Sequence, residues 1–266
     1  MLTVKSDPAE APAGTQTLLR GLATIEAVSH GATTLPLISA AIGCTRSTTH
    51  RLVMALVVAG YIKQMPGLGY VLGPKLIELG FCAREQLPLP TVARPYMGKL
   101  ADDTQDTVHL AEAEGGEVFY LDKIPGKRGM EMRSRIGFRM PLAFTGVGKA
   151  LMLDMPEEHW KSLYEEGLSR RVAPANTFTW EAFRARMTDY REQRCAFDLE
   201  ENETGIRCVA APIRDVGGKI VAAISVSSAT HLMPPERMNA LRSVVVSVAE
   251  SISRDLGWTK GRAGPT

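Results

Sequence analysis

Apolar residues recur at helical spacing near the start of the chain and then give way to a strand-like pattern. They lie three or four positions apart over residues 15–30, which predicts a helix that buries one face. The same spacing over 34–42 and 45–59 predicts two more helices, each starting at a threonine suited to capping and ending at a glycine. Two short runs, 61–64 and 70–72, flank a Pro-Gly turn and predict a hairpin.

Two short helices joined by a glycine-containing turn are typical of a helix-turn-helix, and the hairpin would form its wing. Residues 15–73 are therefore predicted to be a winged helix-turn-helix DNA-binding domain. Burial of Thr49, Leu52, Val53 and Leu56 would turn polar residues outward near the N-terminus of the third helix, the end that enters the major groove. The predicted DNA-binding residues are Thr34, Thr45, Arg46, Ser47, Thr48, His50, Arg51 and Lys63.

Charge is distributed unevenly between the two parts of the chain. Residues 15–75 carry five basic side chains and one acidic side chain, whereas residues 87–266 carry equal numbers of each sign. A basic module beside a neutral one is typical of a nucleic-acid-binding domain attached to a body with another task. We therefore expect double-stranded DNA as a partner. Taken alone, the polar residues at the start of the third helix do not require DNA binding. Ser and Thr residues also begin helices in other proteins, and the arginines could simply be solvated.

Beyond the hairpin, the pattern predicts one helix and then a mixed domain. Pro74 opens an apolar linker helix, predicted over 74–87, whose apolar side needs a partner surface. The second domain is predicted over 88–258, and the ends of the chain, 1–14 and 259–266, are predicted to be flexible. The predicted strands of the second domain are 107–113, 117–124, 130–135, 208–214 and 220–227. Its predicted helices are 91–104, 146–154, 180–194 and 235–256.

Paired glycines punctuate the predicted strands. The pairs at 115–116 and 217–218 are suited to tight hairpins, because glycine accepts the positive φ that such turns require. Grouped hairpins with helices outside them predict an α+β fold with an antiparallel sheet, rather than an alternating parallel fold.

Composition and cysteine spacing narrow the class of protein. Apolar residues make up 45% and charged residues 23%, as in ordinary globular proteins. The four cysteines have no Cys-x-x-Cys spacing, and no signal-peptide-like run precedes them, so reduced thiols in a cytoplasmic protein are expected. Apolar runs are far shorter than the ~20 residues that span a bilayer, so no membrane association is expected.

Five blocks of the sequence resemble the IclR-type bacterial transcriptional regulators. They are "GCTRSTTHRLVMALVVAGYI", "GYVLGPKLIELG", "PLAFTGVGKALM", "AFDLEENETGIRCVAAPI" and "IVAAISVSS". The resemblance implies a winged helix-turn-helix, a linker helix and a C-terminal GAF-like effector-binding and oligomerisation domain, with an antiparallel sheet and flanking helices. It implies a homodimer or dimer of dimers on a palindromic operator, no cofactor, and control of a catabolic operon, often through a small carboxylic or aromatic acid.

The resemblance also implies an effector pocket on one side of the sheet. Two features of the residues fit it: Ser225 and Ser227, two apart on a strand, face the same side. Gly146 and Gly148 precede a helix whose amides would be open to a ligand carboxylate. The implied effector-binding residues are Met132, Gly146, Val147, Asp198, Ile206, Cys208, Ser225 and Ser227.

Several of these positions have ordinary alternatives. Cys208 taken alone is more simply a small buried apolar residue, and Asp198 is equally suited to capping its own turn. Its acidic neighbours, Glu200, Glu201 and Glu203, are most simply a solvated turn. Lys149 has two open roles, neutralising an effector acid or lying outside the pocket.

Two departures from the family pattern change particular expectations. The wing tip is Gly67-Leu68-Gly69, where relatives commonly carry a basic residue, so a phosphate contact there is not expected beyond Lys63. Arg194-Cys195 stands where relatives have glycine and an aromatic residue, which would alter the pocket rim.

Two rival functions are weaker. A hydrolase would need a nucleophile elbow, Gly-x-Ser-x-Gly, and no such block occurs. A metal-responsive regulator using His109, Cys195 or Cys208 lacks ligand-like spacing. The sequence therefore predicts a DNA-binding regulator, in the first instance a repressor, whose operator affinity responds to a small organic acid.

Overall fold

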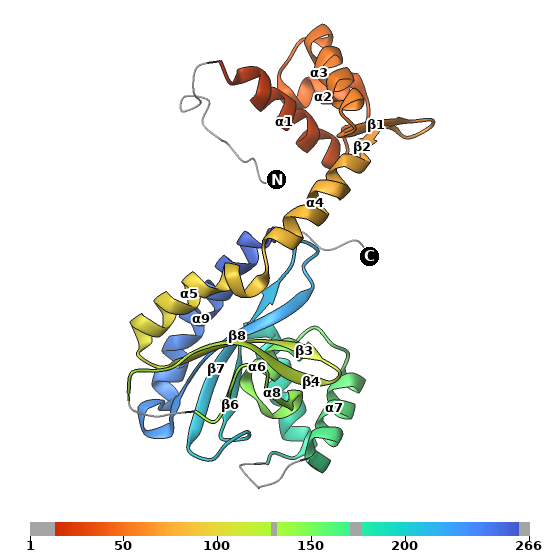
Figure 1. Cartoon of the computed structure of the whole chain (residues 1–266). Coiled ribbons are helices and arrows are strands. Elements are labelled where there is room, and N and C mark those ends of the chain that lie inside the picture. The colour runs from red at the N-terminus through yellow and green to blue at the C-terminus, as the bar shows by residue number, and fades with distance from the viewer. Residues whose placement is uncertain (1–13, 129–131, 171–176, 261–266) are drawn as a thin grey trace. The chain divides into compact units, whose positions relative to one another are not determined.

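The computed structural model describes residues 14–128, 132–170 and 177–260 (Figure 1). The chain divides into two compact units, Met1–Gln86 and Leu87–Thr266. The predicted flexible ends at 1–14 and 259–266 lie outside the described residues, apart from Gly14, Thr259 and Lys260.

The first unit is a winged helix-turn-helix followed by one helix. A small core joins Val28, Ile38, Val53, Ile62 and Tyr70, one from each of the three helices and two strands. Burial of Thr49 and Val53 therefore orients the third helix as the sequence predicts, although Leu52 and Leu56 are only half-buried. The elements are α1 (Gln16–Ser29), α2 (Leu35–Ile42), α3 (Arg46–Val58), β1 (Ile62–Met65), β2 (Gly69–Leu72) and α4 (Pro74–Gln86).

One of the two predicted threonine caps is formed and the other is not. The Thr45 hydroxyl oxygen accepts from the Thr48 amide at 3.3 Å and so caps α3. Thr34 holds the cap position of α2 but makes no side-chain cap hydrogen bond. Pro36, two residues later, has no N–H, so only the Leu37 amide is left for a cap side chain to bind.

The second unit is a six-stranded antiparallel sheet in the order β5-β4-β3-β8-β7-β6. The strands are β3 (Thr107–Glu114), β4 (Glu117–Ile124), β5 (Arg139–Pro141), β6 (Ala196–Leu199), β7 (Ile206–Arg214) and β8 (Ile220–Ala229). Both glycine pairs form the predicted hairpins, with Gly115, Gly116 and Gly218 at positive φ. The α+β prediction is confirmed.

Helices cover both faces of this sheet, so the sheet lies between two apolar cores (Figure 1). One face carries α5 (Leu89–Thr104) and α9 (Pro235–Asp255), which lie side by side. The other carries α6 (Gly146–Met152), α7 (Glu157–Arg170) and α8 (Trp180–Gln193), with the short 3₁₀ helix η2 (Leu142–Phe144) before α6. A second 3₁₀ helix, η3 (Thr230–Leu232), precedes α9.

Three local predictions were wrong or incomplete. No strand forms over 132–135, the described part of the predicted 130–135 strand. The Lys123 ammonium donates to the backbone carbonyls of Met132 and Ser134, at 2.9 and 2.7 Å, and thereby takes acceptors that a strand would use. The edge strands β5 and β6 and the helix α7 were not predicted, because β5 and β6 are short and many charged residues interrupt the apolar pattern of α7.

Candidate functional site

The N-terminal part of α3 presents a row of polar side chains to solvent. Arg46, Ser47, His50 and Arg51 are exposed because Thr49 and the residues in register with it face the core. Thr34, Thr45 and Lys63 are exposed as well, whereas Thr48 is half-buried and its hydroxyl contacts that of Thr45 at 3.0 Å. The predicted contact residues other than Thr48 are therefore exposed, and those on α3 lie in its N-terminal half.

The wing is fixed to the loop before α2. The Tyr70 amide donates to the Thr33 carbonyl at 2.8 Å, and a Cβ at Gly69 would lie 2.2 Å from the same oxygen. Glycine is thus required at position 69 for the close approach. The tip presents Leu68, 60% exposed, and Lys63 is the basic side chain on the hairpin strands.

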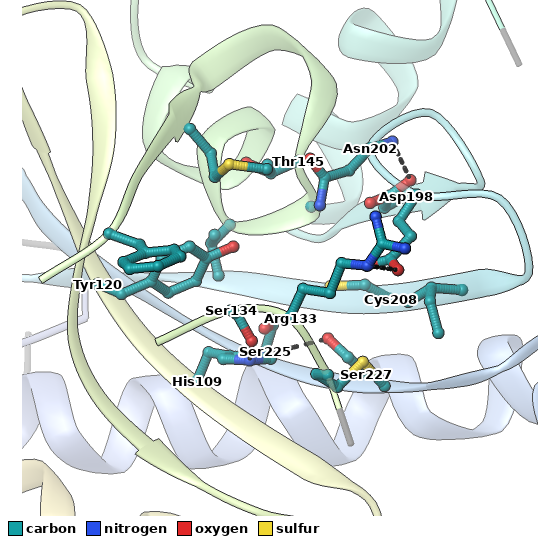
Figure 2. Close-up of a pocket in the computed structure, with 17 residues that line it drawn as sticks. His109, Tyr120, Arg133, Ser134, Thr145, Asp198, Asn202, Cys208, Ser225 and Ser227 are labelled. Atoms are coloured by element: carbon teal, nitrogen blue, oxygen red, sulfur yellow. Dashed lines mark hydrogen bonds and ion pairs between the residues drawn. The ribbon is translucent and has the colours of Figure 1, made fainter. Parts of the chain in front are cut away.

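A cavity of about 210 Å³ opens in the second unit between the sheet and the start of α6 (Figure 2). All eight positions implied by the family resemblance line it. They are Met132, Gly146, Val147, Asp198, Ile206, Cys208, Ser225 and Ser227. Nine further residues line the same cavity, namely His109, Tyr120, Arg133, Ser134, Phe138, Met140, Thr145, Asn202 and Glu203.

Strand register builds the floor of this cavity. Asp198, Cys208 and Ser227 lie opposite one another on β6, β7 and β8, and Ser225 lies opposite His109 of β3. Because side chains alternate along a strand, these residues share one face while Ile224 and Val226 enter the other core. The same alternation could have predicted that His109 lines the cavity, whereas the sequence suggested His109 only as a metal ligand.

His109 is buried and hydrogen-bonded on both ring nitrogens. Its Nε2 lies 2.7 Å from the Ser134 hydroxyl and its Nδ1 lies 3.4 Å from that of Ser227. Burial, reinforced by the nearby charge of Lys123, lowers the pKa of His109 to about 3. The imidazole is therefore neutral at physiological pH, and its one donor and one acceptor nitrogen are used by the two serine hydroxyls.

Asp198 caps its own turn and also lines the cavity. One carboxylate oxygen accepts from the amides of Glu201 and Asn202, at 2.9 and 3.4 Å. Burial raises the pKa of Asp198 to about 7, against the opposing effect of Lys149 and with a smaller contribution from Glu201. The charge of this side chain is thus sensitive to pH near neutrality.

Of the two roles left open for Lys149, lying outside the pocket agrees with the structure, because Lys149 is not among the lining residues. Lys149 belongs to α6, and its ammonium donates to the Glu201 carboxylate. The side chains of Lys149 and Glu201 are 1% and 2% exposed. Burial is the largest single effect and lowers the pKa of Lys149, but the attraction of Glu201, Tyr190 and Asp198 and the hydrogen bond to Glu201 together raise it above its usual value. The acidic turn is not simply solvated, since Glu200 pairs with Arg207 and Glu203 with Arg133.

Gly146 makes room for the thiol of Cys208. A Cβ at position 146 would lie 2.5 Å from the Cys208 Sγ, which is closer than real Cβ contacts allow. Burial raises the pKa of Cys208 to about 12, so the thiol stays neutral. The amide of Gly148 is not open to a ligand as predicted, because the Thr145 hydroxyl already accepts from it at 3.0 Å.

Over 14–128, 132–170 and 177–260, no three His, Cys, Asp or Glu side chains come together as a metal-ion cluster would require. Across the same ranges, no helix combines the length and apolar character needed to cross a bilayer.

Comparison with known proteins covers both units. Residues 17–66 match the IclR helix-turn-helix domain, and residues 82–254 match the "Bacterial transcriptional regulator IclR C-terminal" domain. The chain is 33% identical to the Escherichia coli K12 HTH-type transcriptional regulator XynR over 246 residues, 91% of this chain and 98% of XynR. It is also 33% identical to the DNA-binding transcriptional repressor YiaJ of the same organism, over 94% of this chain and 91% of YiaJ.

A solved structure extends the comparison. The chain is similar to an IclR homolog from Microbacterium hydrocarbonoxydans crystallised with 4-hydroxybenzoate, with a TM-score of 0.55 and 25% identity. The match covers 90% of this chain and 98% of that one.

Proposed function

Since the chain belongs to the IclR family of bacterial transcriptional regulators, we propose that its 210 Å³ cavity binds a small organic acid that controls the affinity of α3 for operator DNA. The protein is a DNA-binding transcriptional regulator with an effector-binding C-terminal domain. The proposal concerns the effector, the residues that bind it and the assembly.

The observation that carries the proposal is the convergence of eight separately placed positions on one cavity. They come from the segment after β4, the start of α6, and strands β6, β7 and β8. An apolar wall with a few convergent polar groups is typical of small-molecule sites. The volume lies below the range of roughly 300–1,000 Å³ common for ligand pockets, which favours a small ligand.

The lining favours a carboxylic or aromatic acid. Hydroxyl groups of Ser134, Ser225 and Ser227 supply hydrogen bonds, while Arg133 brings a guanidinium to the lining. That side chain is 89% exposed and pairs with Glu203 at 3.4 Å. A weak, solvated ion pair of this kind leaves the guanidinium able to exchange Glu203 for a ligand carboxylate.

DNA binding is proposed to use the exposed row of α3 in the major groove. Arg46 and Arg51 are suited to phosphate or guanine contacts, and Ser47 to phosphate. The wing contributes less, because its tip is apolar.

A second copy of the chain is proposed as the partner of the first unit. Leu18 and Leu22 of α1 and Ile77 and Phe81 of α4 are between 49% and 77% exposed, which leaves apolar side chains that a homodimer would cover. A two-fold dimer, alone or paired into a tetramer, would require a palindromic operator. Effector binding would then shift the population between dimer states that differ in operator affinity.

We propose repression of a catabolic operon and no catalytic activity. YiaJ, which is 33% identical, is named as a repressor. His109 contacts two serine hydroxyls, as a catalytic base would, but a pKa of about 3 makes the imidazole a poor proton acceptor near neutral pH.

A thermal-shift screen of small carboxylic and aromatic acids, with 4-hydroxybenzoate among them, tests the proposal. A ligand that binds the folded protein raises Tm. The acid with the largest shift should then change operator affinity, and the shift should shrink in a Ser225→Ala/Ser227→Ala variant. A panel without any shift, or a shift without a change in DNA binding, would contradict the proposal.

A further inference from the structure

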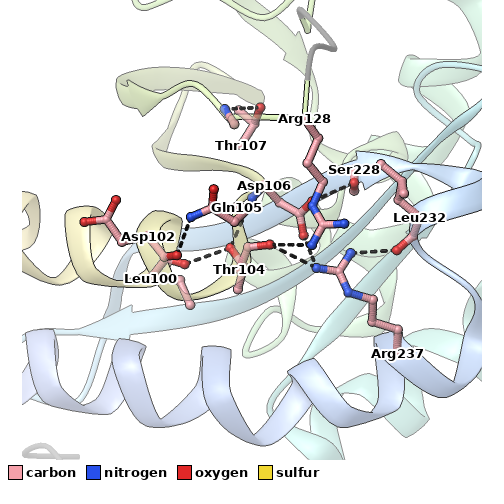
Figure 3. Close-up of polar contacts among 11 residues, drawn as sticks. Leu100, Asp102, Thr104, Gln105, Asp106, Thr107, Arg128, Ser228, Leu232 and Arg237 are labelled. Atoms are coloured by element: carbon pink, nitrogen blue, oxygen red, sulfur yellow. Dashed lines mark hydrogen bonds and ion pairs between the residues drawn. The ribbon is translucent and has the colours of Figure 1, made fainter.

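Beside the cavity, the carboxylate of Asp106 lies between Arg128 and Arg237 (Figure 3). Arg237 of α9 donates to Oδ2 at 2.5 Å, and Nε of Arg128 lies 3.4 Å from Oδ1. The Ser228 hydroxyl donates to Oδ1 at 2.7 Å. The Asp106 side chain is fully buried, and a carboxylate is stable there only when cations and donors replace its hydration.

The same two arginines also bind the end of α5. The carbonyl of Thr104, the last residue of that helix, accepts from Nη2 of Arg128 at 3.1 Å and from Nη2 of Arg237 at 3.2 Å. The last carbonyls of a helix have no partner within the helix, so these bonds satisfy one of them. The cluster of Thr104, Asp106, Arg128, Ser228 and Arg237 therefore joins α5, α9, β8 and the loop after β4.

This cluster adjoins the effector cavity at two places. Ser228 directly follows Ser227, which lines the cavity. Arg128 lines a small pocket together with Met132, and the segment 132–138 contributes Met132, Arg133, Ser134 and Phe138 to the cavity lining.

The segment 132–138 forms one wall of the cavity, and polar contacts support it at two points. The Lys123 ammonium holds the backbone of the wall directly, through its bonds to the Met132 and Ser134 carbonyls. The pair of Arg128 with Asp106 lies beside the wall, because both residues line a small pocket together with Met132.

We propose that Asp106 is a positioning residue for effector binding: it holds Arg128 and Arg237 together, fixes the 132–138 wall and ties that wall to the end of α5. The inference rests on the proposed function, since the cavity must be the effector site. It also suggests how effector binding could reach the DNA-binding unit. The wall is tied to the end of α5, and α5 begins at Leu89, shortly after the linker helix α4 ends at Gln86.

Hydrogen exchange measured by mass spectrometry on the full, ligand-free chain tests the positioning role. Asp106→Asn keeps the side-chain shape but removes the charge that holds both arginines. Amides in 132–138 should exchange about tenfold faster, while those of β7 and β8 stay unchanged. The matched control is Asp102→Asn, because Asp102 pairs with Lys127, beside Arg128, at 2.8 Å but is 67% exposed. That control should leave exchange unaltered.

Two outcomes would overturn the inference. One is unchanged exchange of 132–138 in Asp106→Asn; the other is a uniform increase throughout the second unit, which indicates a purely structural role. If Asp106→Asn does not fold, Arg128→Gln gives the same test, since it leaves Arg237 on Asp106. Failure of the proposed function is seen separately, as the absence of any acid-induced rise in the Tm of the unmodified protein.

Discussion

The ammonium of Lys149 on α6 donates to the carboxylate of Glu201, in the turn after β6, and both side chains are almost completely buried. This pair joins two walls of the cavity, because Gly146 and Val147 belong to the same helix, and Asn202 and Glu203 to the same turn. Glu201 also accepts from the Leu199 amide at 2.9 Å, so the turn and the helix are held by one carboxylate.

Removing one member of this pair should destabilise the second unit strongly. Lys149→Met leaves a buried carboxylate without its cation, a change that costs about 3–5 kcal/mol. The double variant Lys149→Met/Glu201→Gln should lose less than the two single variants together, because no charge is left unpaired. Urea unfolding curves measure the free energy of unfolding of the two single variants and the double variant. Additive losses would show that the two groups do not interact.

Gly146→Ala should destabilise the protein by about 1–3 kcal/mol, since the new methyl group would overlap the Cys208 sulfur. Adding Cys208→Ala removes the sulfur and should recover most of the loss. Thermal unfolding of the single and double variants tests this. If Cys208→Ala fails to rescue Gly146→Ala, the glycine is required for another reason.

The buried neutral state of His109 predicts loss of stability in acid. Its folded pKa of about 3 lies below the unfolded value near 6.5, so protons bind the unfolded chain first as the pH falls. The stability that His109 contributes is complete above pH 6.5 and decreases as the pH falls toward 3. By pH 4.5 the loss should be roughly 2–3 kcal/mol.

A pair of variants isolates this effect. His109→Gln, which does not titrate, should lose less stability than the unmodified protein between pH 7 and 4.5, as measured by urea unfolding. His159 is exposed, so His159→Gln should behave like the unmodified protein. If the free energy of unfolding falls equally with pH in all three proteins, His109 is not the source of the acid sensitivity.

Apolar periodicity predicted most of the long helices and strands correctly. It failed for segments whose conformation depends on contacts with residues far away in the sequence. α3 and β8 follow from apolar spacing within the chain. By contrast, the irregular path of 132–135 depends on Lys123, and no local pattern in the chain reveals that contact. The same holds for the cavity: family motifs identified eight lining positions, whereas Glu201 was taken for a solvated acid because its partner, Lys149, lies 52 residues away.

Arg51→Ala should weaken operator binding about tenfold or more, because an exposed arginine at the start of α3 is placed for a base or phosphate contact. Fluorescence anisotropy with operator DNA at moderate salt measures the change. Arg184→Ala is the matched control, since Arg184 is also exposed but lies on α8. Equal operator affinity for the Arg51 variant and the unmodified protein would remove Arg51 from the interface.

The pKa of Asp198, raised to about 7 by burial, predicts that effector binding weakens as the pH rises. An organic acid enters the cavity as an anion, and an ionised Asp198 would repel it. Below pH 7 the side chain is mostly protonated and the repulsion is absent. Affinity for the acid identified by the thermal-shift screen should therefore fall about tenfold between pH 6 and 8, in calorimetric titrations.

Asp198→Asn separates this charge from the hydrogen bonds of the turn. The amide retains an oxygen that can accept from the Glu201 and Asn202 amides, so the turn should keep its shape. Binding by this variant should become nearly independent of pH and should resemble that of the unmodified protein at pH 6. If affinity instead rises with pH in the unmodified protein, the ligand is held by an ionised Asp198 and is a cation or a hydrogen-bond donor rather than an acid.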